Sequence, residues 1–244
     1  PAVERPLQRM ANRYVNRRFV NLFGYLELDP ELGWANKSSD RADWLRVGQS
    51  YQTDSNGERI GPVPGTPPEA AARTVWILGD SSPFGFGVDG RRIFAERLRL
   101  ALAPERVLVR NLAVVGYNSR QMRQKLALEF RRGRDAPNVL VVWGGFNDTE
   151  YTHRLIWRLP FSERLSLLNY RIQMSRILRL CRSRGVKVIL VTLPSLENYP
   201  PLAPINAWIR SRAAASPDIE VVDVQKSFAD INVRGLYTGR DDRR

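Results

Sequence analysis

The sequence contains one cysteine and one histidine among 244 residues. A lone Cys181 excludes an internal disulfide framework, so cysteine usage says nothing about the redox compartment. With His153 as its single imidazole, the chain has too few ligands for a Cys/His zinc site, and we expect no metal and no cofactor. No apolar run approaches the ~20 residues of a membrane span, and no signal peptide is recognisable. Because the chain starts at Pro1 rather than Met, an upstream targeting or membrane segment is left open.

Acidic residues are scarce relative to basic ones: 38 Lys and Arg stand against 25 Asp and Glu, a net charge of +13. Such a balance is compatible with nucleic acid or an anionic membrane as partner. The arginines, however, are spread over several segments and are not interleaved with an aromatic stacking motif. These segments are Arg5–Arg18, Arg91–Arg110, Arg120–Arg134 and Arg171–Arg184. We therefore interpret the charge as a solvated, arginine-rich surface and predict no nucleic-acid partner.

What the chain does have, from Thr74 onward, is a regular alternation of apolar strands and amphipathic helices. With 43% hydrophobic residues it can fill one well-packed core. Strands that are apolar on both faces and separated by helices indicate a parallel sheet covered on both sides, an α/β fold. The predicted strands are Val75–Leu78, Val107–Val114, Val139–Trp143, Val186–Thr192 and Ile219–Val224, and apolar helical stripes run through Phe94–Leu102 and Leu167–Cys181.

The N-terminal part follows a different pattern, and we predict an extension over residues 1–73 before a main domain at 74–244. Residues 5–23 are predicted to be helical, either packed on the domain or lying as a juxtamembrane amphipathic helix. Residues 24–73 lack sustained periodicity and are rich in turn residues. Within them we expect a small hairpin and then a tether: Ser50–Thr53 pairs with Glu58–Ile60, and the tether is Gly61–Pro68.

Glycine stands beside a polar residue where the first three predicted strands end. In a parallel sheet, the chemistry collects at this carboxyl edge. Ser81 can act there as a nucleophile, and the N–H groups of Ser81 and Gly116 with the side-chain amide of Asn147 can converge on an oxyanion. Each group has a structural alternative, a helix cap for Asp80-Ser81 or Asn147-Asp148 and a turn for Gly116. Their occurrence together at neighbouring strand ends favours a site.

These residues resemble the sequence blocks of the SGNH/GDSL hydrolases, a superfamily of lipase- and esterase-like enzymes. Gly79-Asp80-Ser81 followed by Gly85 and Gly87 looks like the first block, Asn111 and Gly116 like the second, and Gly144-x-x-Asn147-Asp148 like the third. The resemblance runs from about Thr74 to the C-terminus. It implies a three-layer, flavodoxin-like fold with strand order 2-1-3-4-5 and helices on both faces.

A second resemblance concerns the extension. Asp29–Trp34 and Asn56-Gly57-x-Arg59 are similar to the N-terminal extension of membrane-associated or exported members of the superfamily. The resemblance favours a location in the bacterial periplasm or envelope without excluding the cytoplasm. It also leaves room for membrane association through a segment outside this chain.

By resemblance, Ser81 attacks an ester carbonyl, a histidine takes its proton, and the donors of Ser81, Gly116 and Asn147 stabilise the oxyanion. The superfamily supplies the acid and the histidine from a C-terminal D-x-x-H motif. This chain ends in Asp242-Arg243-Arg244 without a histidine. Either the natural protein continues with a histidine after Arg244, or the motif is degenerate. We favour continuation, because the final helix that should cover the sheet is missing too.

His153 is the alternative base, six residues past Asn147 in the loop after the third predicted strand. Its only nearby candidates for an orienting carboxylate are Asp148 and Glu150. We therefore interpret it as an ordinary loop histidine, with geometry as the first test of any base.

The sequence thus predicts a serine esterase acting on acyl or acetyl esters, with a small-molecule or carbohydrate ester as substrate. Two alternatives stand beside it. One is an O-acyltransferase on an envelope polysaccharide, because the same serine chemistry serves both reactions. The other is a non-catalytic SGNH binding module that lacks its histidine. Several aromatic residues near the motifs either line the substrate pocket or belong to the core: Phe84, Phe86, Tyr117, Phe146 and Tyr151.

Overall fold

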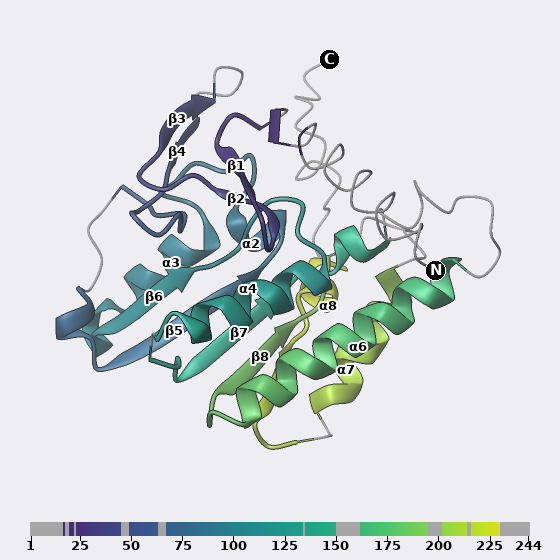
Figure 1. Ribbon diagram of the computed structural model, residues 1–244. Coiled ribbons are helices and arrows are strands. Elements are labelled where there is room, and N and C mark those ends of the chain that lie inside the picture. Colours follow the sequence, from purple (N-terminus) through teal and green to yellow (C-terminus); the bar gives the residue numbers. More distant parts are fainter. Residues whose placement is uncertain are drawn as a thin grey trace, which may run out of the picture.

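The computed structural model describes residues 17, 20–21, 23–44, 49–62, 67–133, 135–149, 162–194, 202–213 and 216–229. The helix predicted over residues 5–23 lies almost entirely outside these residues, as do His153 and Asp242. The centre of the described chain is a five-stranded parallel sheet with helices on both sides (Figure 1).

The strand order of the sheet is β6-β5-β7-β8-β9, which is order 2-1-3-4-5 along the chain. All neighbouring pairs in it are parallel. The predicted α/β class is therefore confirmed, and the sheet order agrees with the one that the resemblance implies. The strands are β5 (Arg73–Gly79), β6 (Val107–Asn111), β7 (Val139–Trp143), β8 (Lys187–Val191) and β9 (Ile219–Val222).

Alternate residues of each strand enter two separate hydrophobic clusters. In β5, Trp76 and Leu78 point to one cluster, whereas Val75 and Ile77 point to the other. The first cluster is filled from α4, α6 and α7, and the second mainly from α3. A strand that is buried on both faces must be apolar throughout, which explains the continuous apolar runs in the sequence. The helices are α2 (Ser81–Phe84), α3 (Phe94–Ala101), α4 (Ser119–Arg131), α6 (Ser162–Arg182), α7 (Ala203–Ala213) and α8 (Val224–Ala229).

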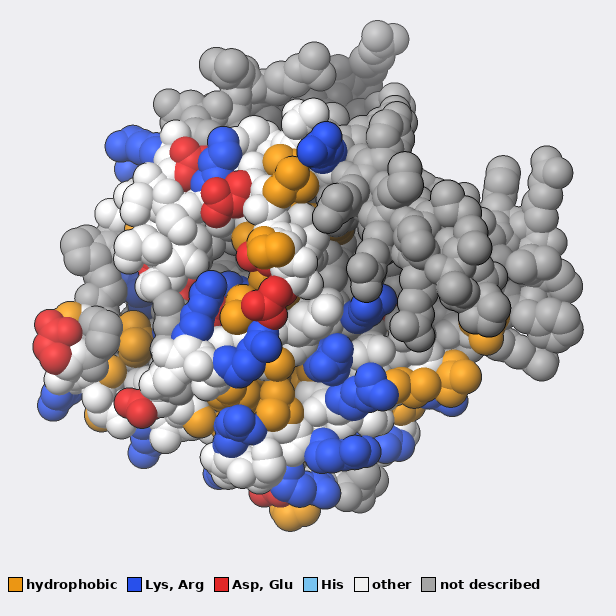
Figure 2. All heavy atoms as spheres, in the orientation of Figure 1, with side chains coloured by type: hydrophobic (Ala, Val, Ile, Leu, Met, Phe, Trp, Pro, Cys, Tyr) orange, Lys and Arg blue, Asp and Glu red, His pale blue; other side chains and the backbone are white. Residues whose placement is uncertain are grey.

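The face formed by α4 and α6 carries many of the basic side chains. Figure 2 shows Lys and Arg side chains spread over this face, with hydrophobic side chains between them. The exposed hydrophobic residues of α6 include Leu165, Leu168 and Ile172. Among the described residues, no helix is both long and apolar enough to cross a bilayer.

The extension contains two short antiparallel hairpins, which lie near α2 at one end of the sheet in Figure 1. They are β1 (Leu26–Asp29) with β2 (Gly33–Asn36), and β3 (Arg41–Trp44) with β4 (Gln49–Gln52). The turn of the first hairpin follows from its sequence. The Asp29 carboxylate accepts the N–H groups of Glu31 and Leu32 at 2.8 and 2.7 Å, and Gly33 follows with a φ of 89°.

The hairpin predicted from Ser50–Thr53 and Glu58–Ile60 forms only in part. A bridge joins Thr53 to Arg59, and the Ile60 N–H donates to the Gln52 carbonyl at 3.0 Å. The main partner of β4 is β3 instead, a strand that the turn-rich sequence did not predict. Short strands of this kind depend on tertiary contacts rather than on their own periodicity.

The extension packs into the core of the main domain. Tyr25, Trp34 and Tyr51 belong to the same buried cluster as Trp76 and Leu140 of the sheet. The rings of Tyr25 and Phe84 are stacked with centroids 5.8 Å apart, and the guanidinium of Arg59 lies 4.9 Å from the centre of the Phe84 ring. The extension therefore touches the segment that follows β5, where the serine motif stands.

Candidate active site

Ser81 is the first residue of α2, directly after β5 and the linking residue Asp80. Asp80 caps this helix: its carboxylate accepts the Ser82 N–H at 3.0 Å. The preceding Gly79 has no room for a side chain, because a Cβ there would lie 2.0 Å from the Trp143 carbonyl oxygen. The predicted helix cap is therefore present, and it places the half-buried Ser81 at the edge of the sheet.

Gly116 lies at the same edge, on the loop after β6. The Val114 N–H donates to the Gly79 carbonyl at 3.3 Å, so this loop continues beside the end of β5. Gly116 has a φ of 81°, in the left-handed region that glycine adopts without steric cost. The loop then enters α4 through Asn118, whose side chain accepts the Gln121 N–H at 3.1 Å in a capping box.

Asn147 follows β7, the neighbour of β5 on its other side. Gly79 is paired with Trp143 in the sheet register. The segment that carries Asn147 therefore leaves the sheet beside Asp80 and Ser81, the first residues of the serine turn (residues 80–88). The Asn147 Nδ2 donates to the Tyr117 carbonyl at 3.0 Å, which ties it to the residue after Gly116. The structure thus brings Ser81, Gly116 and Asn147 to three adjacent strand ends, as the sequence predicted.

Two buried carboxylates join these three segments. Besides capping α2, Asp80 accepts the Gly145 N–H at 3.2 Å and so links the ends of β5 and β7. Asp148 accepts the N–H and the hydroxyl of Ser119 at 2.9 and 2.5 Å and links the β7 loop to α4. Burial raises the pKa of Asp80, and burial raises the pKa of Asp148 to about 7. Sequence reasoning gave neither residue this linking role, although both stand inside the recognised blocks.

The raised pKa of Asp148 predicts a pH-dependent contribution to stability. Its folded-state pKa of about 7 lies above the ordinary value of about 3.9. The folded protein therefore binds a proton that the unfolded chain has lost, and the free energy of unfolding falls as pH rises from about 4 to about 7.

Asp148→Asn removes this titration. The free energy of unfolding of the natural protein minus that of the variant should fall between pH 4 and pH 7 and level off above pH 8, as measured by urea denaturation. A difference that is constant over this range would show that Asp148 does not titrate there.

Arg59 of the extension holds the far end of the serine turn. Its guanidinium donates to the carbonyls of Phe84 and Gly85, and to that of Val88 at 2.7 Å. These carbonyls belong to the end of α2 and the loop after it, and that of Gly85 also accepts the Val88 N–H at 3.0 Å. The Asn56-Gly57-x-Arg59 motif entered the sequence analysis only through its resemblance to an N-terminal extension, and nothing in the sequence indicated that Arg59 would reach these carbonyls.

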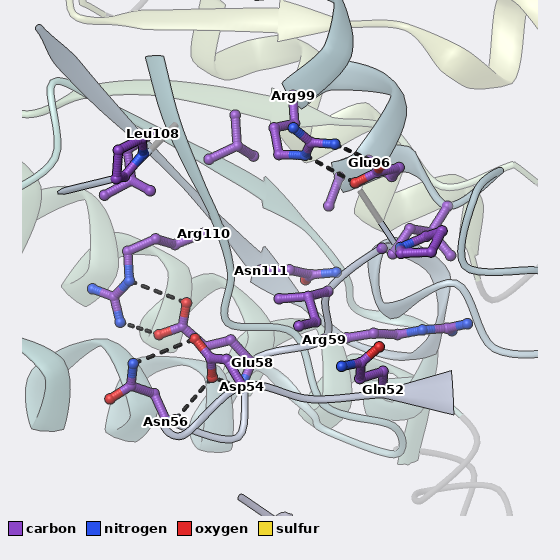
Figure 3. A pocket seen from close by; sticks show the side chains of 17 residues that line it. Gln52, Asp54, Asn56, Glu58, Arg59, Glu96, Arg99, Leu108, Arg110 and Asn111 are labelled. Carbon is purple, nitrogen blue, oxygen red and sulfur yellow. Dashed lines mark hydrogen bonds and ion pairs between the residues drawn. The ribbon is translucent and has the colours of Figure 1, made fainter. Parts of the chain in front are cut away.

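A cavity of about 490 Å³ lies between the extension, α3 and β6. Two ion pairs lie in its wall: Arg110 with Glu58, and Arg99 with Glu96 at 2.6 Å (Figure 3). Burial raises the pKa of Glu58 to about 6 in spite of its arginine partner. None of Ser81, Gly116 and Asn147 lines the cavity, so it is separate from the candidate active site.

The aromatic residues near the motifs divide between core and surface. Phe84 and Tyr117 are buried core residues, whereas Phe86 and Phe146 are each 39% exposed. Tyr151 lies outside the described residues, as do the predicted base residues His153 and Asp242. Among the described residues, no group of three or more His, Cys, Asp or Glu side chains could hold a metal ion.

Comparison with known proteins identifies the family of the chain. Residues 77–243 match the GDSL-like lipase/acylhydrolase family, and the chain belongs to that family. The matched region begins within β5 and includes Ser81, Gly116 and Asn147. No curated protein matches the chain.

Solved structures share the fold. AlinE4, an SGNH-hydrolase family esterase, is 20% identical over 66% of this chain and 80% of its own, with a TM-score of 0.52. BT4096, a gut microbial diltiazem-metabolizing enzyme, is 16% identical over 69% of this chain and 39% of its own, with a TM-score of 0.50. The fold of this chain is therefore the SGNH hydrolase fold.

Proposed function

We propose that the protein hydrolyses acyl or acetyl esters through a covalent acyl-enzyme on Ser81. The observation that carries this proposal is the meeting of Ser81, Gly116 and Asn147 at adjacent strand ends. The membership of the GDSL-like lipase/acylhydrolase family supports ester hydrolysis as the reaction class.

In the first step the Ser81 oxygen bonds to the ester carbonyl carbon and its proton passes to a base. The carbonyl oxygen takes the negative charge and accepts hydrogen bonds from the N–H groups of Ser81 and Gly116. Asn147 contributes the second hydrogen of its amide, because the first is bonded to the Tyr117 carbonyl. Collapse of this intermediate expels the alcohol, which takes up the proton, and water then releases the acid from Ser81 in the same way.

Only the sequence indicates which residue acts as the base. The superfamily resemblance assigns the base to the C-terminal motif of Asp242, with His153 as the alternative, and both residues lie outside the described part of the chain. One variant distinguishes the two assignments of the base. His153→Ala should retain full esterase activity if the C-terminal motif supplies the base.

The reaction is tested with the protein expressed from its complete natural reading frame. Release of p-nitrophenol from acetyl, butyryl and octanoyl esters is measured first, and release of acetate is then compared with and without a polysaccharide acceptor. Hydrolysis without acceptor is expected. Release that requires the acceptor would replace hydrolysis with acyl transfer, and no release under either condition would favour the non-catalytic binding module.

A further inference from the structure

Trp34 of the extension contacts both neighbours of Gly116. Its indole Nε1 donates to the Val115 carbonyl at 2.9 Å, and its own carbonyl accepts the Tyr117 hydroxyl at 2.7 Å. Both hydrogen bonds are buried, and Trp34 is 3% exposed. The rings of Trp34 and Tyr117 lie edge to face with centroids 6.0 Å apart. Trp34, 82 positions earlier in the chain, is therefore hydrogen-bonded on both sides of Gly116, the residue that supplies one proposed oxyanion donor.

The bond to the Val115 carbonyl has a direct consequence for the Gly116 N–H, because the two groups belong to one peptide unit. A trans peptide is planar, and its C=O and N–H point in opposite directions. Because the Val115 oxygen is bonded to the Trp34 indole, the Gly116 N–H points away from that indole. The same bond polarises the peptide and strengthens its N–H as a donor.

Because residue 116 is a glycine, its backbone needs an outside contact to hold one orientation. Gly116 has a φ of 81°, and without a Cβ it can reach alternative backbone orientations at little steric cost. A second hydrogen bond holds the loop upstream of Gly116: the Asn36 Nδ2 donates to the Ala113 carbonyl at 3.2 Å. Asn36 and Trp34 both belong to β2, so one strand of the extension holds the loop on the Val115 side of Gly116.

We infer that Trp34 is a positioning residue, which fixes the direction of the Gly116 N–H for the tetrahedral oxyanion. The inference rests on the proposed function, in which Gly116 is an oxyanion donor. It assigns the N-terminal extension a role in the reaction: the extension completes the active site from outside the region matched by the family.

The test removes the indole N–H of Trp34 in two variants. Trp34→Phe removes the donor but also some volume, so a second variant carries benzothienylalanine at position 34, where sulfur replaces the N–H. In both variants kcat should fall about tenfold with KM within about twofold, because removal of a whole oxyanion donor costs about 10²–10³ in kcat. The backbone amide resonance of Gly116, followed by NMR, should shift in both.

Trp76→Phe is the matched control. Trp76 is also buried in this core, at 1% exposure, and its Nε1 has no hydrogen-bond partner in the part of the chain that the structure describes. It should lose stability but keep kcat and the Gly116 resonance. If Trp76→Phe lowers kcat as much as Trp34→Phe does, packing rather than the hydrogen bond is responsible, and the inference is overturned.

The outcomes also separate this inference from the proposed function. If the natural protein does not hydrolyse esters, the proposed function fails, whereas the Gly116 resonance still reports whether Trp34 holds the peptide. If the protein hydrolyses esters and the benzothienylalanine variant keeps the natural kcat and resonance, Trp34 does not position Gly116.

Discussion

Ser81→Ala is expected to abolish ester hydrolysis, with kcat lowered by about 10⁴-fold or more. The variant loses the oxygen that forms the acyl-enzyme, while the remaining donors provide only weak catalysis. The fold should be unaffected, because the Asp80 carboxylate caps α2 through the Ser82 N–H rather than through the Ser81 side chain. Initial rates with p-nitrophenyl acetate and the thermal unfolding midpoint test both statements.

Ser82→Ala is the control for this substitution. Ser82 is the exposed neighbour of Ser81 in the same short helix. It carries a hydroxyl that the proposed mechanism does not use. The variant should retain ester hydrolysis, and if it loses activity while Ser81→Ala keeps it, the nucleophile has been assigned to the wrong serine.

Asn147→Ala is expected to lower kcat at least tenfold, and typically about 10²–10³-fold, because it removes one of three proposed oxyanion donors. KM should change little, since the donor acts on charge that develops only in the transition state. The substitution also frees the Tyr117 carbonyl, to which Nδ2 donates at 3.0 Å. An unchanged rate on a p-nitrophenyl ester would remove Asn147 from the mechanism.

Asn138 offers a matched control at the opposite end of the same strand. It directly precedes β7, and its side-chain oxygen accepts the Thr74 N–H at 2.8 Å. Asn138→Ala therefore also removes one amide and one hydrogen bond to the backbone, but at the amino edge of the sheet. Its activity should match that of the natural protein, which would show that the loss in Asn147→Ala depends on position.

The sheet could be predicted from the sequence because burial on both faces leaves a continuous apolar run. The prediction for β7, Val139–Trp143, agrees with the structure at both ends. The prediction for β6 was too long at its C-terminal end, since the apolar run continues to Val114 but the strand ends at Asn111. There the Asn111 side chain accepts the Ala113 N–H at 3.2 Å, a local bond that apolar periodicity does not reveal.

The candidate site was predictable for a different reason. Ser81, Gly116 and Asn147 each follow a predicted strand, and the carboxyl ends of parallel strands share one edge. Trp34 and Arg59 could not be found in this way, because their hairpin segments have little periodicity and their partners lie far along the chain. Arg59, for example, donates to carbonyls 25 to 29 residues later, and Trp34 to one 81 residues later. Contacts of this range follow from the folded structure rather than from local pattern.

If Ser81 is an activated nucleophile, it should react covalently with a fluorophosphonate. The protein from its complete natural reading frame is treated with a fluorophosphonate, digested, and mapped by mass spectrometry. We predict one adduct, on the peptide that contains Ser81, and none in Ser81→Ala. An unlabelled Ser81 in the folded natural protein, or an adduct on another residue, would show that Ser81 is not the nucleophile.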